Sequence, residues 1–200
     1  MKNIIVSFSY IFHPIFMGLY VFILYYLLGN DYFNPNEMYL FLIQIIVFTL
    51  LIPITLLYFF INIRLIDSIM ISDVSQRRIP LFTMLLVLIF FIKKSNFLPL
   101  VPIIYHFFSA GIIAIFIALT FTFFKIKVSM HLISITSITC FIAFLGITYQ
   151  NNFSSLLAFF IAMIGCVATS RLYMKAHNFK ELTLGFFIGL ITQIFFFLIN

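Results

Sequence analysis

The sequence predicts an all-α protein, a polytopic transmembrane bundle of six or seven helices. Of its 200 residues, 64% are hydrophobic and 8% are charged, and the mean hydropathy is +1.24, whereas a soluble domain is about one-quarter charged. The apolar runs are long and lack the alternation of a membrane β-barrel strand. Because backbone polar groups in lipid must be satisfied internally, these runs are expected to be helices.

Crossing the hydrocarbon core takes about 20 residues. The candidate spans are 10–28, 38–62, 81–92, 101–124, 132–149, 153–169 and 182–199. The third is short and ends at Lys93 and Lys94, so it extends backwards past Pro80, extends forwards towards Phe97, or only dips into the membrane. The count of six or seven spans depends on that segment. We expect one transmembrane domain over 1–200, with its site-bearing core at about 64–200.

The polar segments between the spans form two sets when the crossings are counted. One set holds little beyond turn residues and consists of 30–37, 93–96 and 150–152. The other set carries nearly all the chemically capable side chains and consists of the amino terminus, 64–80, 125–131 and 170–181. Two crossings separate successive members of the second set, so they should meet at one membrane surface.

The charge of the chain favours lipid over nucleic acid as a partner. The net charge is +6, but the basic residues are scattered over short loops rather than gathered on one helix face. The headgroups of anionic membrane lipids or a phosphorylated ligand are the better partners. Cys140 and Cys166 lie inside predicted spans, and the His spacing fits no metal motif, so we expect no metal and no cofactor. We assign His13 and His106 no role.

The strongest candidate site precedes the last span. His177 and Glu181 are four residues apart, so the carboxylate can orient the imidazole as a nucleophile or base. Arg171 offers a planar fork of donors suited to phosphate, and Ser170 adds a hydroxyl. Ionisable groups at membrane depth are costly and suggest function. The alternative is that Arg171 and Lys175 are interfacial anchors and His177 lies at headgroup level.

Two weaker clusters come earlier in the chain. Lys127, Ser129 and His131 open the fifth span, and His131 could protonate a leaving oxygen while another His attacks phosphorus. Arg77 and Arg78 precede the third span and could neutralise the oxygens of a transferring phosphoryl group. Each cluster alone has a simpler interpretation, a hydrogen-bonded interfacial His in the first case and a topology-setting basic loop in the second.

Taken in order, the clusters resemble the motifs of the type-2 phosphatidic acid phosphatase superfamily, which are K-x6-R-P, P-S-G-H and S-R-x5-H-x3-D. The resemblance covers about 73–200. The last motif matches through Ser170-Arg171, five residues, His177, three residues, and Glu181 in place of Asp. The glycine-containing helix that follows the motif in this superfamily has a counterpart in 182–189.

The other two motifs are less complete. The second keeps Ser129 and His131 but has Val128 for Pro and Met130 for Gly. The first has no Lys at the expected distance, and one residue separates Arg78 from the proline.

The resemblance implies a membrane lipid phosphatase that works without a metal through a phosphohistidine. His177 would be the nucleophile, Glu181 its orienting carboxylate and His131 the general acid. The groups implied to hold phosphate are Arg171, Ser170, Ser129, one of Arg77 and Arg78, and Lys127 in place of the missing Lys. The motif departures leave two alternatives: a catalytically degenerate member, or a transporter-like bundle that binds phosphorylated lipid without turnover.

We expect an integral protein of the bacterial inner membrane, with the side of the site left open. Nine of the eleven Lys and Arg fall on the site face, which the positive-inside rule would make cytoplasmic. The resemblance instead implies a site on the outer face.

Overall fold

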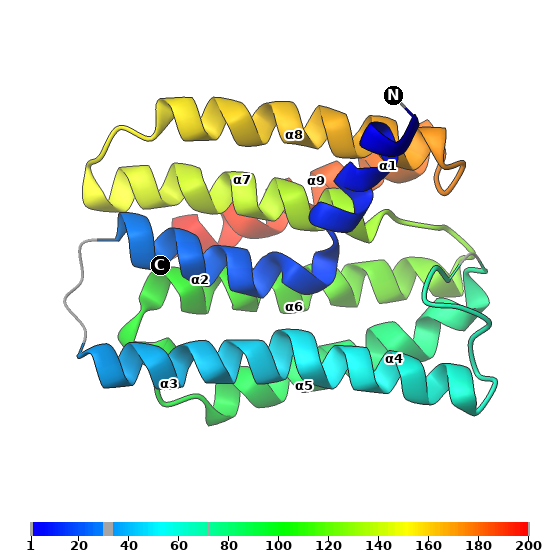
Figure 1. The fold of residues 1–200 in the computed structure, drawn as a ribbon, viewed down its shortest axis with the longest axis horizontal. Coiled ribbons are helices and arrows are strands. Elements are labelled where there is room, and N and C mark those ends of the chain that lie inside the picture. Colours follow the sequence, from blue (N-terminus) through cyan, green and yellow to red (C-terminus); the bar gives the residue numbers. More distant parts are fainter. Residues whose placement is uncertain (1, 30–33, 72, 200) are drawn as a thin grey trace.

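The computed structural model describes residues 2–29, 34–71 and 73–199, and within them every regular element is a helix (Figure 1). The α-helices are α1 (Lys2–Ile11), α2 (Met17–Leu28), α3 (Pro35–Ile46), α4 (Ile52–Asn62), α5 (Arg78–Lys94), α6 (Pro102–Phe123), α7 (Met130–Tyr149), α8 (Ser154–Tyr173) and α9 (Phe179–Ile199). The 3-10 turns are η1 (Pro14–Phe16), η3 (Ser75–Arg77) and η4 (Leu98–Leu100), and η2 (Val47–Leu51) is a π turn.

Six segments are long and apolar enough to cross a membrane, and a seventh is counted if the bent pair of α1 and η1–α2 is one span. The predicted all-α bundle of six or seven spans is therefore confirmed. The third expected span is longer than its apolar run, because η3 and α5 together cover the 20 residues Ser75–Lys94. Pro80 lies in the first turn of α5, where its missing N–H breaks no helical hydrogen bond. The uncertain crossing is thus the first span.

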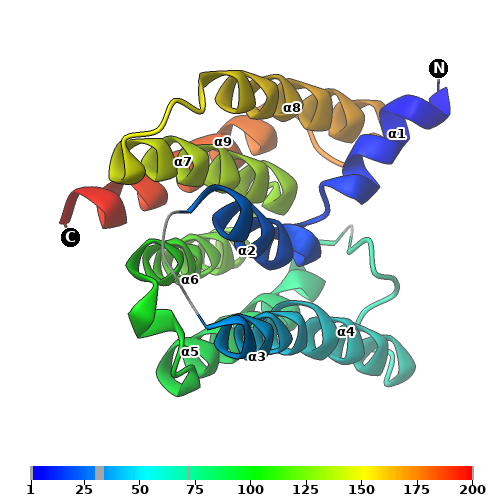
Figure 2. The same ribbon diagram turned by 60° about the vertical axis from the view of Figure 1, so that its left-hand side comes forward.

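The first span is broken at His13 and Pro14. Its two parts meet at 44°, since proline lacks an N–H and starts a new helix well. His13 caps that start, because its Nδ1 accepts a hydrogen bond from the Ile15 N–H at 3.3 Å. The sequence predicted a span from residue 10, whereas helix α1 begins at Lys2. As a result α1 packs on α8 while α2 packs on α7 (Figure 2).

Helix α7 is the centre of the bundle. It packs against α9, α8, α6 and α2, and two thirds of the residues in its 18-residue apolar stretch are buried. Two glycines of α9 allow the closest approach. A Cβ at Gly185 would lie 2.5 Å from the Ser129 carbonyl oxygen, and one at Gly189 would lie 2.5 Å from that of Ile133. Only glycine fits against a backbone at this distance, so the start of α7 lies directly against the second and third turns of α9.

The connecting segments divide between the two ends of the bundle. The described segments 63–71, 73–74, 124–129 and 174–178 lie at the same end as the amino terminus (Figures 1 and 2). The segments 95–101 and 150–153 lie at the opposite end, toward the carboxy terminus. The clusters singled out in the sequence therefore share one end.

Candidate active site

Hydrogen bonds join the loops at this end. The Arg77 guanidinium reaches from η3 to the loop before α7, where Nη1 donates to the Val128 carbonyl at 3.1 Å. From that loop, Lys127 Nζ donates to the Ala176 carbonyl at 2.8 Å, in the turn before α9. All three loops are thereby fixed relative to one another.

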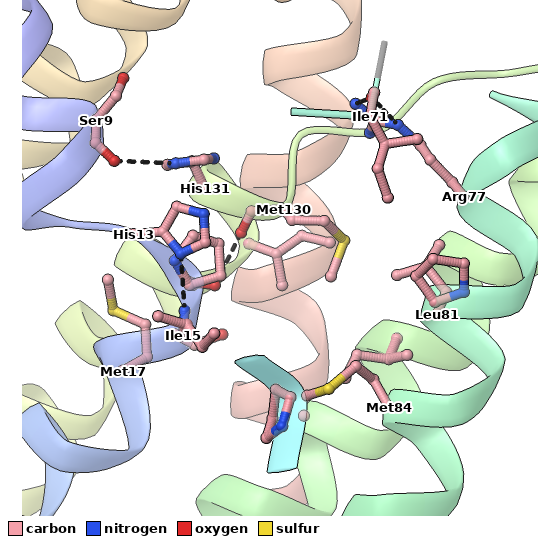
Figure 3. A pocket seen from close by; sticks show the side chains of 18 of the residues that line it. Ser9, His13, Ile15, Met17, Ile71, Arg77, Leu81, Met84, Met130 and His131 are labelled. Carbon is pink, nitrogen blue, oxygen red and sulfur yellow. Dashed lines mark hydrogen bonds between the residues drawn. The ribbon is translucent and has the colours of Figure 1, made fainter. Parts of the chain in front are cut away.

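A cavity of about 510 Å³ opens among these loops and continues down between the helices. Five ionisable side chains predicted as site residues line its polar end: Arg77, Lys127, His131, Arg171 and His177. The walls farther along the helices are apolar and include Met17, Leu81, Met84, Leu88, Phe107 and Phe108. Figure 3 shows Met17 on the η1–α2 side of this space and Leu81 and Met84 on the α5 side. The cavity therefore joins a cationic end to an apolar chamber.

His177 is held in the tautomer that a nucleophile requires. Its Nδ1 lies 2.6 Å from Glu181 Oε2, and a carboxylate oxygen accepts, so Nδ1 carries the proton and Nε2 keeps a lone pair. Asn178 in turn fixes Glu181. Its amide donates to Glu181 Oε1 at 3.1 Å, and its Oδ1 accepts from the Glu181 N–H at 3.0 Å. The Glu that replaces the expected Asp thus reaches the imidazole.

The electrostatic surroundings keep His177 neutral. The imidazole is buried, and this burial lowers its pKa well below the ordinary value of 6.5. The positive charges of Arg77, Lys127 and Arg171 lower the pKa further. Burial and the charge of Arg77 also lower the pKa of the Lys127 ammonium. A bound anion would relieve this repulsion among the cations.

His131 faces the same cavity from the first turn of α7. Its Nε2 lies 3.1 Å from the Ser9 carbonyl oxygen. A carbonyl can only accept, so Nε2 carries a proton and Nδ1 is the nitrogen left for a substrate. The ring is buried, with 8% of its surface exposed.

Arg171 is the clearest unfilled donor in the cavity wall. The side chain is 6% exposed, and its Nε and Nη1 have no hydrogen-bond partner among the described residues. Arg171 lies in the last turn of α8 and is held in place by the turn that ends this helix. Lys175 is left-handed at φ 51°, and the N–H groups of Lys175 and Ala176 donate to the Leu172 and Arg171 carbonyls, as in a Schellman turn. Buried donors are normally paired, so this guanidinium is suited to an anion.

Ser129, Ser170 and Arg78 do not line the cavity. Ser129 is fully buried as the N-cap of α7, and its Oγ accepts from the Leu132 N–H at 3.4 Å. Ser170 Oγ is 2.6 Å from Ser9 Oγ. Arg78 turns away, donating to the Thr122 carbonyl and packing over the Phe123 ring. Of the two arginines, Arg77 is the one beside the site.

The sequence missed Ser9, His13 and Asn178. His13 lines the cavity, and its ring centroid is 5.1 Å from that of His131. The available signal was a His-Pro pair interrupting an apolar run, which predicts a helix break. For Asn178 the signal was the capping-box spacing to Glu181. Within the described residues no group of three His, Cys, Asp or Glu side chains gathers as a metal site.

Comparisons with known proteins add no relative. The chain matches no family model, no curated protein and no solved structure.

Proposed function

We propose that this membrane protein is a phosphatase acting on a lipid phosphate or lipid diphosphate through a phosphohistidine. One observation carries the proposal: a buried arginine with two unpartnered donors shares a cavity with a histidine whose Nε2 is left as a nucleophile. An anion would satisfy the guanidinium, and a phosphorus atom bound there is the electrophile that a neutral imidazole attacks.

The reaction follows from the hydrogen bonds. His177 Nε2 attacks phosphorus while Glu181 stabilises the charge that develops on the ring. Because Nε2 of His131 already carries a proton, Nδ1 first takes the proton of a phosphate monoanion, which makes the ring an imidazolium. The bond from phosphorus to the leaving oxygen then breaks, and that oxygen takes the proton from Nδ1. Water then attacks the phosphohistidine and gives a proton to Nδ1 of His131, and inorganic phosphate leaves with that proton, so both histidines return to their starting state. Arg171, Arg77 and Lys127 neutralise the phosphoryl oxygens throughout.

The apolar chamber supports a lipid as the substrate. Met17, Leu81 and Met84 line the cavity beyond its cationic end, so a phosphate at the arginines leaves an attached chain against apolar side chains. Burial of that chain supplies binding energy that a small soluble phosphate lacks. We propose the bacterial cell membrane as the location, with membrane lipids and the phosphorylated lipid as partners.

The test is phosphate release by purified protein in detergent, with chelator present. A long-chain alkyl monophosphate and an isoprenyl diphosphate serve as substrates. His177→Ala should lower turnover by about 10³-fold or more. His106→Ala is the matched control, since His106 lies on α6 outside the cavity lining. Equal release by the wild type and His177→Ala would refute the catalytic role.

Ligand binding separates an active enzyme from a protein that binds without turnover. Vanadate should raise the melting temperature of the wild type, and Arg171→Ala should abolish that shift. Arg77→Ala should weaken it, whereas Arg78→Ala should not, because only the first of these arginines lines the cavity. A vanadate shift without phosphate release would favour the non-catalytic alternative.

A further inference from the structure

Two groups of the broken first span, the Ser9 carbonyl and the His13 ring, contact His131. The carbonyl of Ser9, in α1, accepts the hydrogen bond from His131 Nε2 at 3.1 Å. The ring of His13, at the break, lies against the His131 ring at an interplanar angle of 89°. Figure 3 shows the edge of the His13 ring directed at the face of the His131 ring. The orientation of His131 is thereby fixed from two sides.

The proton on His13 can be located by the same reasoning as for His131. His13 Nδ1 accepts from the Ile15 N–H, so in the neutral ring the proton is on Nε2. The Nε2 side of His13 is the edge turned toward His131 in Figure 3. An edge-to-face pair of this kind is attractive and has a defined geometry.

The amino-terminal helix that carries these groups is itself anchored at the site. Ser9 Oγ and Ser170 Oγ are 2.6 Å apart and both buried. Ser170 directly precedes the unpartnered Arg171 on α8. Helix α1, which contacts His131, is therefore anchored to α8, the helix that carries Arg171.

We propose that His13 is a positioning residue that aims Nδ1 of His131 at the leaving oxygen. The proposal rests on the phosphatase function proposed above. With Nε2–H committed to the Ser9 carbonyl, only Nδ1 can take up the proton of the substrate phosphate and pass it to the leaving oxygen, and a ring rotation misaligns Nδ1. His13 blocks that rotation by packing against the ring face.

A comparison of leaving groups isolates this role. The alkoxide oxygen that leaves a long-chain alkyl phosphate is strongly basic and must be protonated as it departs. The 4-nitrophenolate of 4-nitrophenyl phosphate departs without protonation. His13→Asn keeps a good N-cap for η1 but removes the ring. His106→Asn is the control, since that ring lies outside the cavity lining.

We expect His13→Asn to lower kcat for the alkyl phosphate about 10- to 100-fold, as supporting groups behind a reactive residue do. The KM should change little, and kcat for 4-nitrophenyl phosphate should fall less than about threefold because the nucleophile and phosphate ligands remain. Retained cleavage of the aryl phosphate also shows that the variant is folded.

Two results would overturn the positioning role while leaving the phosphatase function intact. One is an equal loss with both substrates, which indicates general damage to the fold. The other is full alkyl phosphate turnover by His13→Asn, which indicates that His13 only caps the helix. A wild-type protein that cleaves neither substrate refutes the phosphatase function itself, and with it this inference.

Discussion

The exchange Glu181→Gln tests whether His177 depends on one tautomer. In the native network, Glu181 Oε2 accepts from His177 Nδ1 and Oε1 accepts from the Asn178 amide. A glutamine has only one oxygen for these two donors. If its oxygen faces His177, its NH₂ opposes the NH₂ of Asn178. If its NH₂ faces His177, Nδ1 must accept, the proton moves to Nε2, and the nucleophile is lost.

The magnitude follows from the hydrogen bond that each arrangement loses. Turning the Asn178 amide over would relieve the donor clash, but Oδ1 would then no longer accept from the backbone N–H of residue 181. The active arrangement therefore leaves one donor unpaired, which costs about 1–3 kcal/mol. The inactive tautomer is favoured by that amount, so kcat/KM should fall about 5- to 150-fold, given a tenfold change per 1.4 kcal/mol.

The assay is phosphate release by Glu181→Gln, by Asn178→Asp and by the double variant. An aspartate at 178 accepts from both the backbone N–H and the glutamine NH₂, so the glutamine oxygen can face His177 again. The double variant should recover most of the loss. Wild-type turnover by Glu181→Gln, or no recovery in the double variant, would refute the tautomer reasoning.

Four further predictions concern pH and packing. Because the pKa of His177 lies below 6.5, kcat/KM should hold as pH falls through 6.5 and drop only below it, and a midpoint near 6.5 would contradict the burial argument. As pH falls, the unfolded state binds this proton before the folded state does, so the free energy of unfolding should decrease below pH 6.5, which denaturation at several pH values would measure. Lys127→Gln removes one of the positive charges that lower the pKa of His177, so the fall of kcat/KM on the acid side should shift to higher pH. Gly189→Ala should destabilise the bundle by about 1–3 kcal/mol, since a Cβ would meet a backbone oxygen at 2.5 Å, whereas Gly165→Ala meets nothing within 4 Å and should leave thermal unfolding in detergent unchanged or slightly raised.

Apolar run length was enough to predict the helices, because in lipid a backbone has few ways to satisfy its own polar groups. It was less precise at the edges of runs, where the sequence left the extent of the third span open and began the first span too late. The third span extends backwards through Pro80 to Ser75, where proline and polar residues hide the start of the helix. The first span bends at Pro14, and hydropathy does not report a change of direction.

Motif spacing identified His177, Glu181 and Arg171, because these side chains lie within one turn and one helix start, where sequence distance fixes spatial distance. It could not choose between Arg77 and Arg78. Adjacent residues on a helix point in different directions, and the packing of η3 and α5 decides which of the two faces the cavity.

By itself, then, the sequence determined the membrane class and the local chemistry of each loop, since both depend on residues that are neighbours along the chain. Only the tertiary structure decided that Ser9 and His13 meet His131, more than a hundred residues later, and that Ser129 and Ser170 serve the fold rather than the cavity wall. The physical reason is that glycine contacts between α7 and α9 and the bend at Pro14 set the distances between helices, and no spacing within one segment encodes them.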